Sequence, residues 1–133
     1  MIHEKIILLD TSMLMLPSER KINLTYELDR LVPLRKKIAV PSIVIQELQT
    51  LINKGSPAIK QKARLALSLS KQFQILETDT EGEADRELES LAEELNAIVA
   101  TNDSELRLKL RKKGIVVISL RGDNKLEVFG NID

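Results

Sequence analysis

Short apolar runs alternate with longer stretches of helical apolar spacing along this chain. A short apolar run predicts a buried strand, whereas apolar residues three or four apart predict an amphipathic helix. Strands are predicted over residues 6–9, 37–40, 73–76, 97–101, 115–120 and 126–129, and helices over 22–31, 41–55, 57–69, 84–95 and 104–113. Strands that alternate with helices build a parallel sheet covered on both faces. We therefore predict an α/β fold, a three-layer α/β/α arrangement around a central, mostly parallel sheet.

Proline, serine and glycine residues mark the expected boundaries of these elements. Pro17-Ser18 is interpreted as an interruption of the chain, and Ser42 as the N-cap of the helix that Pro41 opens. Gly55 and Gly114 are expected to end helices, since glycine follows many helix ends.

Length and composition limit both the architecture and the chemistry. With 133 residues the chain can build one core but not two, so we expect a single domain over residues 1–133. The absence of cysteine excludes disulfides and thiolate chemistry. Aromatic residues make up only 2% of the chain, which argues against a stacking platform for single-stranded nucleic acid. We see no signal peptide or membrane span and expect a cytoplasmic protein.

The charges balance overall but are unevenly distributed. The 20 basic and 20 acidic residues give a net charge of zero, so bulk charge does not indicate a polyanionic partner. Acids dominate residues 77–94, and basic residues cluster in 35–37, 60–64 and 107–113. Basic clusters around an acidic pocket would suit a phosphate backbone held near a metal ion. The plainer interpretation of each cluster is a solvated helix face.

Four acidic residues stand where the predicted fold gives them no structural role. Asp10 and Asp103 follow two predicted strands, Asp85 opens a helix, and Glu47 lies one turn into another. Ligands bind at the carboxyl ends of strands in an open parallel sheet. Carboxylates that meet there repel one another unless a cation or a proton neutralises them, and Mg²⁺ and Mn²⁺ prefer such oxygen ligands. The sequence therefore predicts a site for Mg²⁺ or Mn²⁺.

Other polar residues near these acids are candidates for supporting roles. Thr11, Ser12, Thr101 and Asn102 could position water or a carboxylate, and Glu83 and Asp79 are weaker candidates for the site itself.

Each of the four acids also has a simpler explanation. Asp10 could cap a helix over residues 11–16, and Asp103 could cap the helix that follows it. Asp85 could be a first-turn acid favoured by the helix dipole, and Glu47 a solvated polar residue. His3, the only histidine, is expected to be an exposed terminal residue. Isolated glycines argue against a phosphate-binding loop. The convergence of four acids at one edge favours the metal site over the separate explanations.

The segments that carry these acids resemble the successive motifs of PIN-domain ribonucleases. The matching segments are Ile-Leu-Leu-Asp-Thr-Ser (7–12), Val-Pro-Ser-Ile-Val-Ile-Gln-Glu-Leu (40–48), Ala-Asp (84–85) and Ala-Thr-Asn-Asp (100–103). Their order and spacing cover nearly the whole chain. Segments 10–17 and 116–130 are most similar to an archaeal group that resembles the eukaryotic rRNA-processing nucleases of the small-subunit processome.

The resemblance implies a metal-dependent single-strand endoribonuclease, with an rRNA precursor as its substrate. It assigns Asp10, Glu47, Asp85 and Asp103 to the catalytic, metal-binding cluster with Mg²⁺ or Mn²⁺, and Thr101 or Asn102 to a supporting role. Many relatives have a second acid after the third-motif aspartate, where this chain has Arg86.

The family also implies a homodimer, or a protein partner such as an antitoxin. Two alternatives remain open: a VapC-type toxin ribonuclease, and a non-catalytic scaffold that binds RNA or protein. Retention of all four acids argues against the scaffold, because a scaffold has no need to tolerate their mutual repulsion.

Overall fold

The computed structural model describes residues 4–33 and 35–132, and within them six strands form one sheet in the order β3-β2-β1-β4-β5-β6. The strands are β1 (Lys5–Leu9), β2 (Lys36–Pro41), β3 (Gln74–Leu76), β4 (Ile98–Ala100), β5 (Val117–Arg121) and β6 (Lys125–Phe129). The first five run parallel, and β6 pairs antiparallel with β5. The prediction of a mostly parallel sheet is confirmed.

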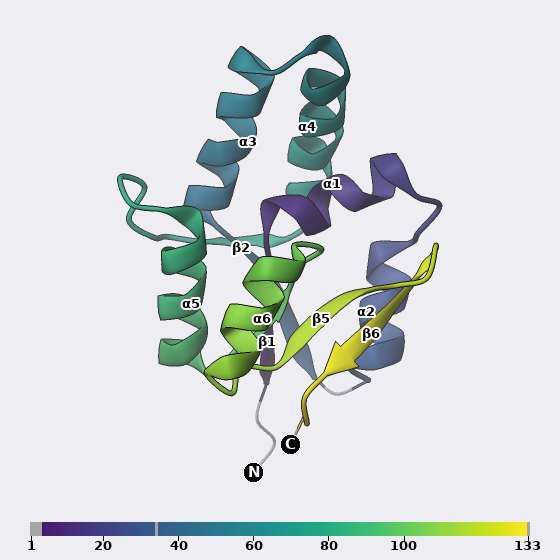
Figure 1. The fold of residues 1–133 in the computed structure, drawn as a ribbon, viewed down its shortest axis with the longest axis vertical. Helices are drawn as coiled ribbons and strands as arrows, with labels where there is room; N and C mark the ends of the chain where they lie inside the picture. The colour runs from purple at the N-terminus through teal and green to yellow at the C-terminus, as the bar shows by residue number, and fades with distance from the viewer. Residues whose placement is uncertain (1–3, 34, 133) are drawn as a thin grey trace.

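Helices cover both faces of this sheet. Among the described residues they are α1 (Thr11–Glu19), α2 (Leu24–Leu31), α3 (Ser42–Lys54), α4 (Pro57–Ser70), α5 (Ala84–Leu95) and α6 (Ser104–Lys112). Right-handed crossovers place α5 and α6 on one face and the helices that follow β1 on the other. Figure 1 shows α6 in front of the central strands, α2 behind β6, and the α3–α4 hairpin rising beyond the sheet. The predicted three-layer α/β/α arrangement is confirmed.

The core is centred on β1, which is buried on both faces. Ile7, Leu8 and Leu9 have no exposed surface, and Leu28 of α2 and Leu88 of α5 belong to the same core. A strand covered on both faces is expected to have a continuous apolar sequence, and β1 has one at Ile6 to Leu9. Burial of each such Leu or Ile side chain contributes about 1.5–3 kcal/mol.

Two of the expected helix boundaries are wrong. Pro17 does not interrupt the chain, because α1 continues through it to Glu19. Burial of Met13 to Leu16 against the core stabilises this helix across the proline. Ser42 is not an N-cap, since it is the first residue of α3 and Pro41 holds the cap position. Oγ1 of Thr78 takes over the capping role by accepting the N–H of Ile43 at 3.0 Å.

The ends of two other elements also shift. α2 begins at Leu24 rather than at residue 22, because the side chain of Asn23 accepts the N–H of Tyr26 as an N-cap. β5 begins at Val117 rather than at residue 115, because the N–H of Ile115 still bonds to the C-terminal end of α6.

An ion pair between a buried glutamate and an exposed arginine satisfies the outer edge of β6. Glu27 of α2 has 6% of its surface exposed, and its Oε1 accepts the N–H of Leu126 at 2.8 Å. Nη2 of Arg30 bonds to the same Oε1 and to the carbonyl oxygen of Leu126, both at 2.9 Å. The pair thus replaces the next strand at this position, which limits pairing with another chain.

Two further predictions concerned His3 and membrane-spanning segments. His3 lies outside the described residues. Within residues 4–33 and 35–132, no helix has the length and apolar character needed to cross a membrane.

Candidate functional site

The carboxyl ends of β1 and β4 lie side by side, because the strands pair in parallel with Leu9 opposite Ala100. The N–H of Asp10 extends the ladder by donating to the carbonyl oxygen of Ala100 at 3.2 Å. Asp10 then caps α1, and Asp103 caps α6. The two acids that follow strands therefore share one edge of the sheet, as the topology predicted.

Asp10 is a buried carboxylate held by three hydrogen bonds. Only 5% of its surface is exposed. Its Oδ1 accepts the hydroxyl of Ser12 and the N–H of Met13, both at 2.8 Å, and its Oδ2 accepts the hydroxyl of Thr101. Burial raises the pKa of Asp10 to about 6, although the hydrogen bonds from Thr101, Met13 and Ser12 act in the opposite direction. The fold thus fixes the orientation of this acid at an electrostatic cost.

Asp103 caps α6 with only one of its two carboxylate oxygens. Its Oδ1 accepts the N–H of Glu105 at 2.9 Å and that of Leu106 at 3.2 Å. No donor reaches its Oδ2 in the described part of the chain, so this oxygen remains available to a ligand. The N–H of Asp103 donates to Oγ1 of Thr101 at 3.0 Å, and Thr101 thereby connects Asp103 to Asp10. Capping a helix and binding a ligand are therefore compatible roles for these acids.

The other two acids approach this edge from neighbouring helices. Asp85 is half-buried in the first turn of α5. Burial raises its pKa and the negative charge of Asp103 raises it further, whereas the positive charge of Lys109 on α6 lowers it. Glu47 is exposed on α3, whose first residues follow the carboxyl end of β2.

All four acids line a single cleft of about 310 Å³. The remaining lining residues belong to α1 and α5 and are Thr11, Ser12, Met15, Glu19, Ala84 and Leu88. Oγ1 of Thr11 is buried and has no hydrogen-bond partner among the described residues. Buried hydroxyls are nearly always paired, so this one is a free hydrogen-bonding group at the wall of the cleft.

The predicted supporting residues contribute in different ways. Ser12 and Thr101 bond directly to Asp10, and their own hydroxyls lie 3.2 Å apart. Asn102 enters this network through its backbone N–H, which donates to Oγ of Ser12 at 2.8 Å. Thr11 lines the cleft itself.

The weaker candidates do not line this cleft. Oδ1 of Asp79 accepts the N–H of Glu81 within an exposed turn, and Glu83 pairs with Arg86 at 3.7 Å. Their carboxylates therefore belong to the rim beyond the cleft, where water solvates them.

One acid of the cleft, Glu19, and one basic residue near it, Lys109, were not predicted from the sequence. Met15 follows Ser12 by three residues and Glu19 follows Met15 by four, which places the three side chains on one face of α1. That signal was hidden because α1 was expected to stop before Pro17. Lys109 was grouped with the other basic residues of α6, and only the effect of its charge on Asp85 of α5 places it near the cleft.

The chemistry of the donors fits a hard cation. All of the cleft's charged groups are carboxylates, and oxygen ligands are those that Mg²⁺ and Mn²⁺ prefer. Within residues 4–33 and 35–132, no three acidic or histidine side chains converge closely enough to hold one ion. Glu47 and Asp103 are exposed and can change rotamer, whereas Asp10 is fixed. Binding of an ion would therefore require the exposed acids to move toward Asp10.

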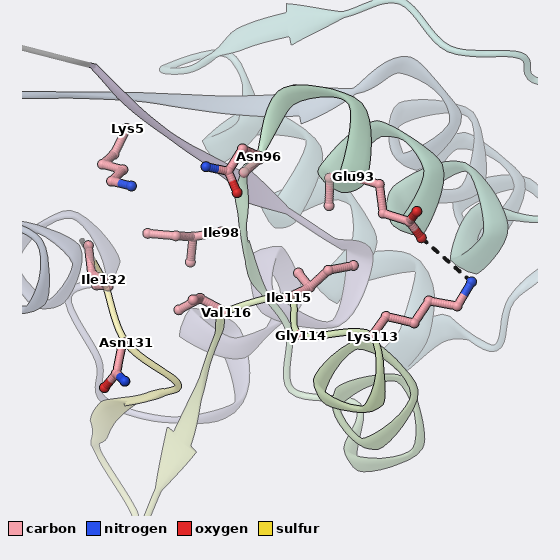
Figure 2. A pocket seen from close by; sticks show the side chains of 12 residues that line it. Lys5, Glu93, Asn96, Ile98, Lys113, Gly114, Ile115, Val116, Asn131 and Ile132 are labelled. Carbon is pink, nitrogen blue, oxygen red and sulfur yellow. Dashed lines mark ion pairs between the residues drawn. The ribbon is translucent and has the colours of Figure 1, made fainter.

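A second cavity, of about 500 Å³, lies at the opposite edge of the sheet (Figure 2). Lys5 at the start of β1, Ile98 at the start of β4 and Asn131 near the C-terminus line it, and the Lys113–Glu93 ion pair spans 3.5 Å at its side. Parallel sheets bind ligands at the carboxyl ends of their strands, and none of the four predicted acids reaches this cavity. The acidic cleft is therefore the better candidate site.

Known proteins resemble this chain in both sequence and structure. The family described as a PIN like domain matches residues 7–123. Ribonuclease VapC4 of Methanocaldococcus jannaschii is 34% identical over 128 residues, which cover 92% of this chain and 95% of the relative. Ribonuclease VapC9 of Archaeoglobus fulgidus is 35% identical over 92 residues, which cover 69% of this chain and 67% of the relative.

The solved structures agree with the sequence relatives. The PIN domain endonuclease Utp24 superposes with a TM-score of 0.79 at 26% identity, and the match covers 96% of this chain and 93% of Utp24. A domain of an M. jannaschii protein of unknown function has the same fold, with a TM-score of 0.66 at 21% identity over 97% of this chain and 99% of that domain. The resemblance expected from the four motifs is confirmed, and the chain belongs to the PIN-domain family.

Proposed function

We propose that this chain is a metal-dependent single-strand endoribonuclease, formed by a single PIN-like domain over residues 1–133, with Asp10, Glu47, Asp85 and Asp103 as its catalytic, metal-binding residues. One observation carries the proposal: four acids from four separate elements line one cleft at the carboxyl edge of the sheet. The names of the relatives, two ribonucleases and an endonuclease, support the reaction class. Mg²⁺ or Mn²⁺ is the proposed cofactor, because every charged donor in the cleft is a carboxylate.

Hydrolysis of a phosphodiester needs a nucleophile at neutral pH and neutralisation of charge on the phosphoryl oxygens, and bound divalent ions supply both. The contribution of the chain is to position the donors. Ser12, Thr101 and the N–H of Met13 hold the Asp10 carboxylate in one orientation. Asp103 keeps one oxygen on α6 and offers the other to the cleft. The fixed orientation of the Asp10 carboxylate reduces the reorganisation needed in the transition state.

The substrate assignment rests on the family and on the charges beside the cleft. Lys109 is the basic residue whose charge reaches Asp85, so it can bind a phosphate that neighbours the one being cleaved. The three aromatic residues, Tyr26, Phe73 and Phe129, do not line the cleft. We therefore infer weak intrinsic affinity for RNA, with a partner protein, a homodimer or an assembly contributing to recognition.

Two biological roles are compatible with this chemistry. Segments 10–17 and 116–130, which resemble the rRNA-processing nucleases, favour maturation of an rRNA precursor in the cytoplasm. The VapC relatives favour a toxin ribonuclease whose partner is an antitoxin. Expression in a host cell separates them: a toxin should stop growth by cutting one RNA, whereas a processing enzyme should alter the ends of rRNA precursors. A non-catalytic scaffold would do neither.

The proposed activity can be tested with a labelled single-stranded RNA in the presence of Mn²⁺, Mg²⁺ or EDTA. The wild type should cut with either metal and not with EDTA, and Asp10→Asn and Asp103→Asn should each abolish cutting. Asp79→Asn is the matched control, because this acid lies outside the cleft and should leave the rate unchanged. Full activity in Asp10→Asn would show that the site assignment is wrong. Metal-independent RNA binding without any cutting would favour the scaffold.

A further inference from the structure

A narrow groove of about 170 Å³ continues from the acidic cleft, between α3 and the segment that precedes α5. It shares Glu47 and Ala84 with the cleft, so the two cavities are neighbours. The rest of its lining consists of Ile43, Gln46, Thr50, Thr80 and Gly82. A molecule that is cut in the cleft therefore has a defined path along α3.

The groove differs from the cleft in its chemistry. Among the residues that the structure describes, Glu47, at the junction, is the only charged one that lines the groove. Gln46, Thr50 and Thr80 present one amide and two hydroxyls, each of which can both donate and accept hydrogen bonds. Ile43, with 4% of its surface exposed, adds an apolar contact at the base of α3. The groove thus combines an apolar surface with neutral hydrogen-bonding groups and carries no basic residue.

The wall opposite α3 is fixed by contacts to that helix. The N–H of Thr78 donates to Oγ of Ser42 at 2.8 Å, and Oγ1 of Thr78 accepts the N–H of Ile43 at 3.0 Å. The two hydroxyls also lie 3.1 Å apart. These hydrogen bonds hold Thr78 against the first turn of α3. They therefore fix the start of the segment that contains Thr80 and Gly82 and forms the opposite wall of the groove.

We propose that this groove is a nucleobase subsite, which binds the base next to the cleaved phosphate and selects it through the amide of Gln46. The proposal rests on the ribonuclease function proposed above. The groove suits a base better than a phosphate, because among the described residues no positive charge lines it. The edges of unpaired bases offer donors and acceptors together, which is what an amide and two hydroxyls recognise.

The identity of the lining residues also determines how a base would be selected. Aromatic side chains, which bind any base by stacking, are absent from this groove. Hydrogen bonds to the edge of the base therefore dominate, and they discriminate between bases. Gln46 is exposed and lies one residue before the acid that joins the groove to the cleft, so it is placed to select the adjacent base.

The test measures base preference at the cut rather than activity alone. Single-stranded RNAs that differ in one base on either side of the cut would be cleaved with Mn²⁺ by the wild type, Gln46→Ala and Gln49→Ala. Gln49 is the matched control, since it is an exposed glutamine on the same helix that does not line the groove. The readout is the ratio of kcat/KM between the best and the worst base, because this ratio does not depend on the fraction of folded enzyme.

The wild type and Gln49→Ala should prefer the same base at one position beside the cut. In Gln46→Ala the ratio should fall about tenfold, the effect of losing one or two hydrogen bonds. A wild type that cuts all four substrates equally, or a Gln46→Ala variant that keeps the full preference, would overturn the subsite while leaving the ribonuclease intact. A wild type that cuts no RNA would overturn both proposals together.

Discussion

Replacing Asp10 with Asn should make the protein more stable at neutral pH, although it should abolish the proposed activity. Asp10 carries a buried charge, and burial raises its pKa from an ordinary value of 3.8 to about 6. A change in pKa of one is worth about 1.4 kcal/mol, so ionisation of this buried group costs about 3 kcal/mol relative to the unfolded chain. Asparagine has a similar shape and no charge, and it should remove most of that cost.

The hydrogen-bond network can accept the amide while each present partner of Asp10 keeps a hydrogen bond. Oδ1 of the new side chain can keep the bonds from Ser12 and from the N–H of Met13. Its NH₂ group can donate to Oγ1 of Thr101, whose own proton then turns toward Oγ of Ser12, 3.2 Å away. The N-cap of α1 is also retained, because asparagine caps helices as well as aspartate does.

The sign of the pH dependence follows from the raised pKa. Below about pH 4 the carboxyl is protonated in both the folded and the unfolded wild type, so the variant gains little. Between about pH 4 and 6 the unfolded wild type loses its proton while the folded protein keeps it, and the stability that Asp10 contributes falls as the pH rises. The advantage of Asp10→Asn should therefore grow from near zero at pH 4 to at most about 3 kcal/mol above pH 7.

Urea denaturation in EDTA, repeated from pH 4 to 8, measures this difference directly. Asp79→Asn is the control, because it removes an exposed carboxylate outside the cleft that does not act on the pKa of Asp10. Parallel stability curves for the wild type and Asp10→Asn would refute the reasoning. Adding Mn²⁺ should then stabilise the wild type more than Asp10→Asn, by RT ln(1 + [Mn²⁺]/Kd), if the ion binds this acid.

Replacing Glu27 with Ala should lower the free energy of unfolding at pH 7 by about 1–3 kcal/mol, as seen in urea denaturation, because the buried N–H of Leu126 loses its acceptor. The hydrogen bond from Arg30 lowers the pKa of Glu27 below its ordinary 4.5. The stabilisation by Glu27 is therefore present above pH 4.5 and is lost as the pH falls through the pKa of the folded protein. The difference in stability between the wild type and Glu27→Ala should accordingly shrink at about pH 3. Lys109→Gln should raise KM for single-stranded RNA and reduce the slope of log KM against log salt by about 0.7, the share of one phosphate contact. Lys112→Gln, at the C-terminal end of the same helix and farther from the cleft, should change neither quantity, and equal effects of both variants would remove Lys109 from the site.

The position of the strand-end acids was predictable because it depends only on topology. Once the apolar runs at 6–9 and 97–101 are recognised as parallel strands, the residues that follow them must share an edge. Asp10 and Asp103 could therefore be placed together without knowing any side-chain contact. The positions of Asp85 and Glu47 do not follow from topology alone. Each lies on a helix whose rotation relative to the sheet edge depends on packing.

The errors arose where tertiary contacts replace a local signal. Pro17 is a helix breaker by propensity, yet burial of the preceding turn holds α1 together as far as Glu19, and the missed turn hid that acid of the cleft. Ser42 looked like an N-cap because the hydroxyl that takes over its role, in Thr78, comes from a segment 36 residues away. No pattern within either segment reports such a partner.

The electrostatics of the cleft distinguish a functional acid from a structural one. A cap needs a carboxylate near an N-terminus, and Asp103 meets that need while exposed to water. Asp10 makes the same cap from a buried position, where even three hydrogen bonds do not offset the loss of hydration. Asparagine would cap equally well at no such cost, so helix capping alone does not explain an aspartate here. At neutral pH, where a proton is scarce, a cation that enters the cleft lined by Asp10, Asp85 and Asp103 would offset this cost, and that is the strongest physical argument for metal binding at this site.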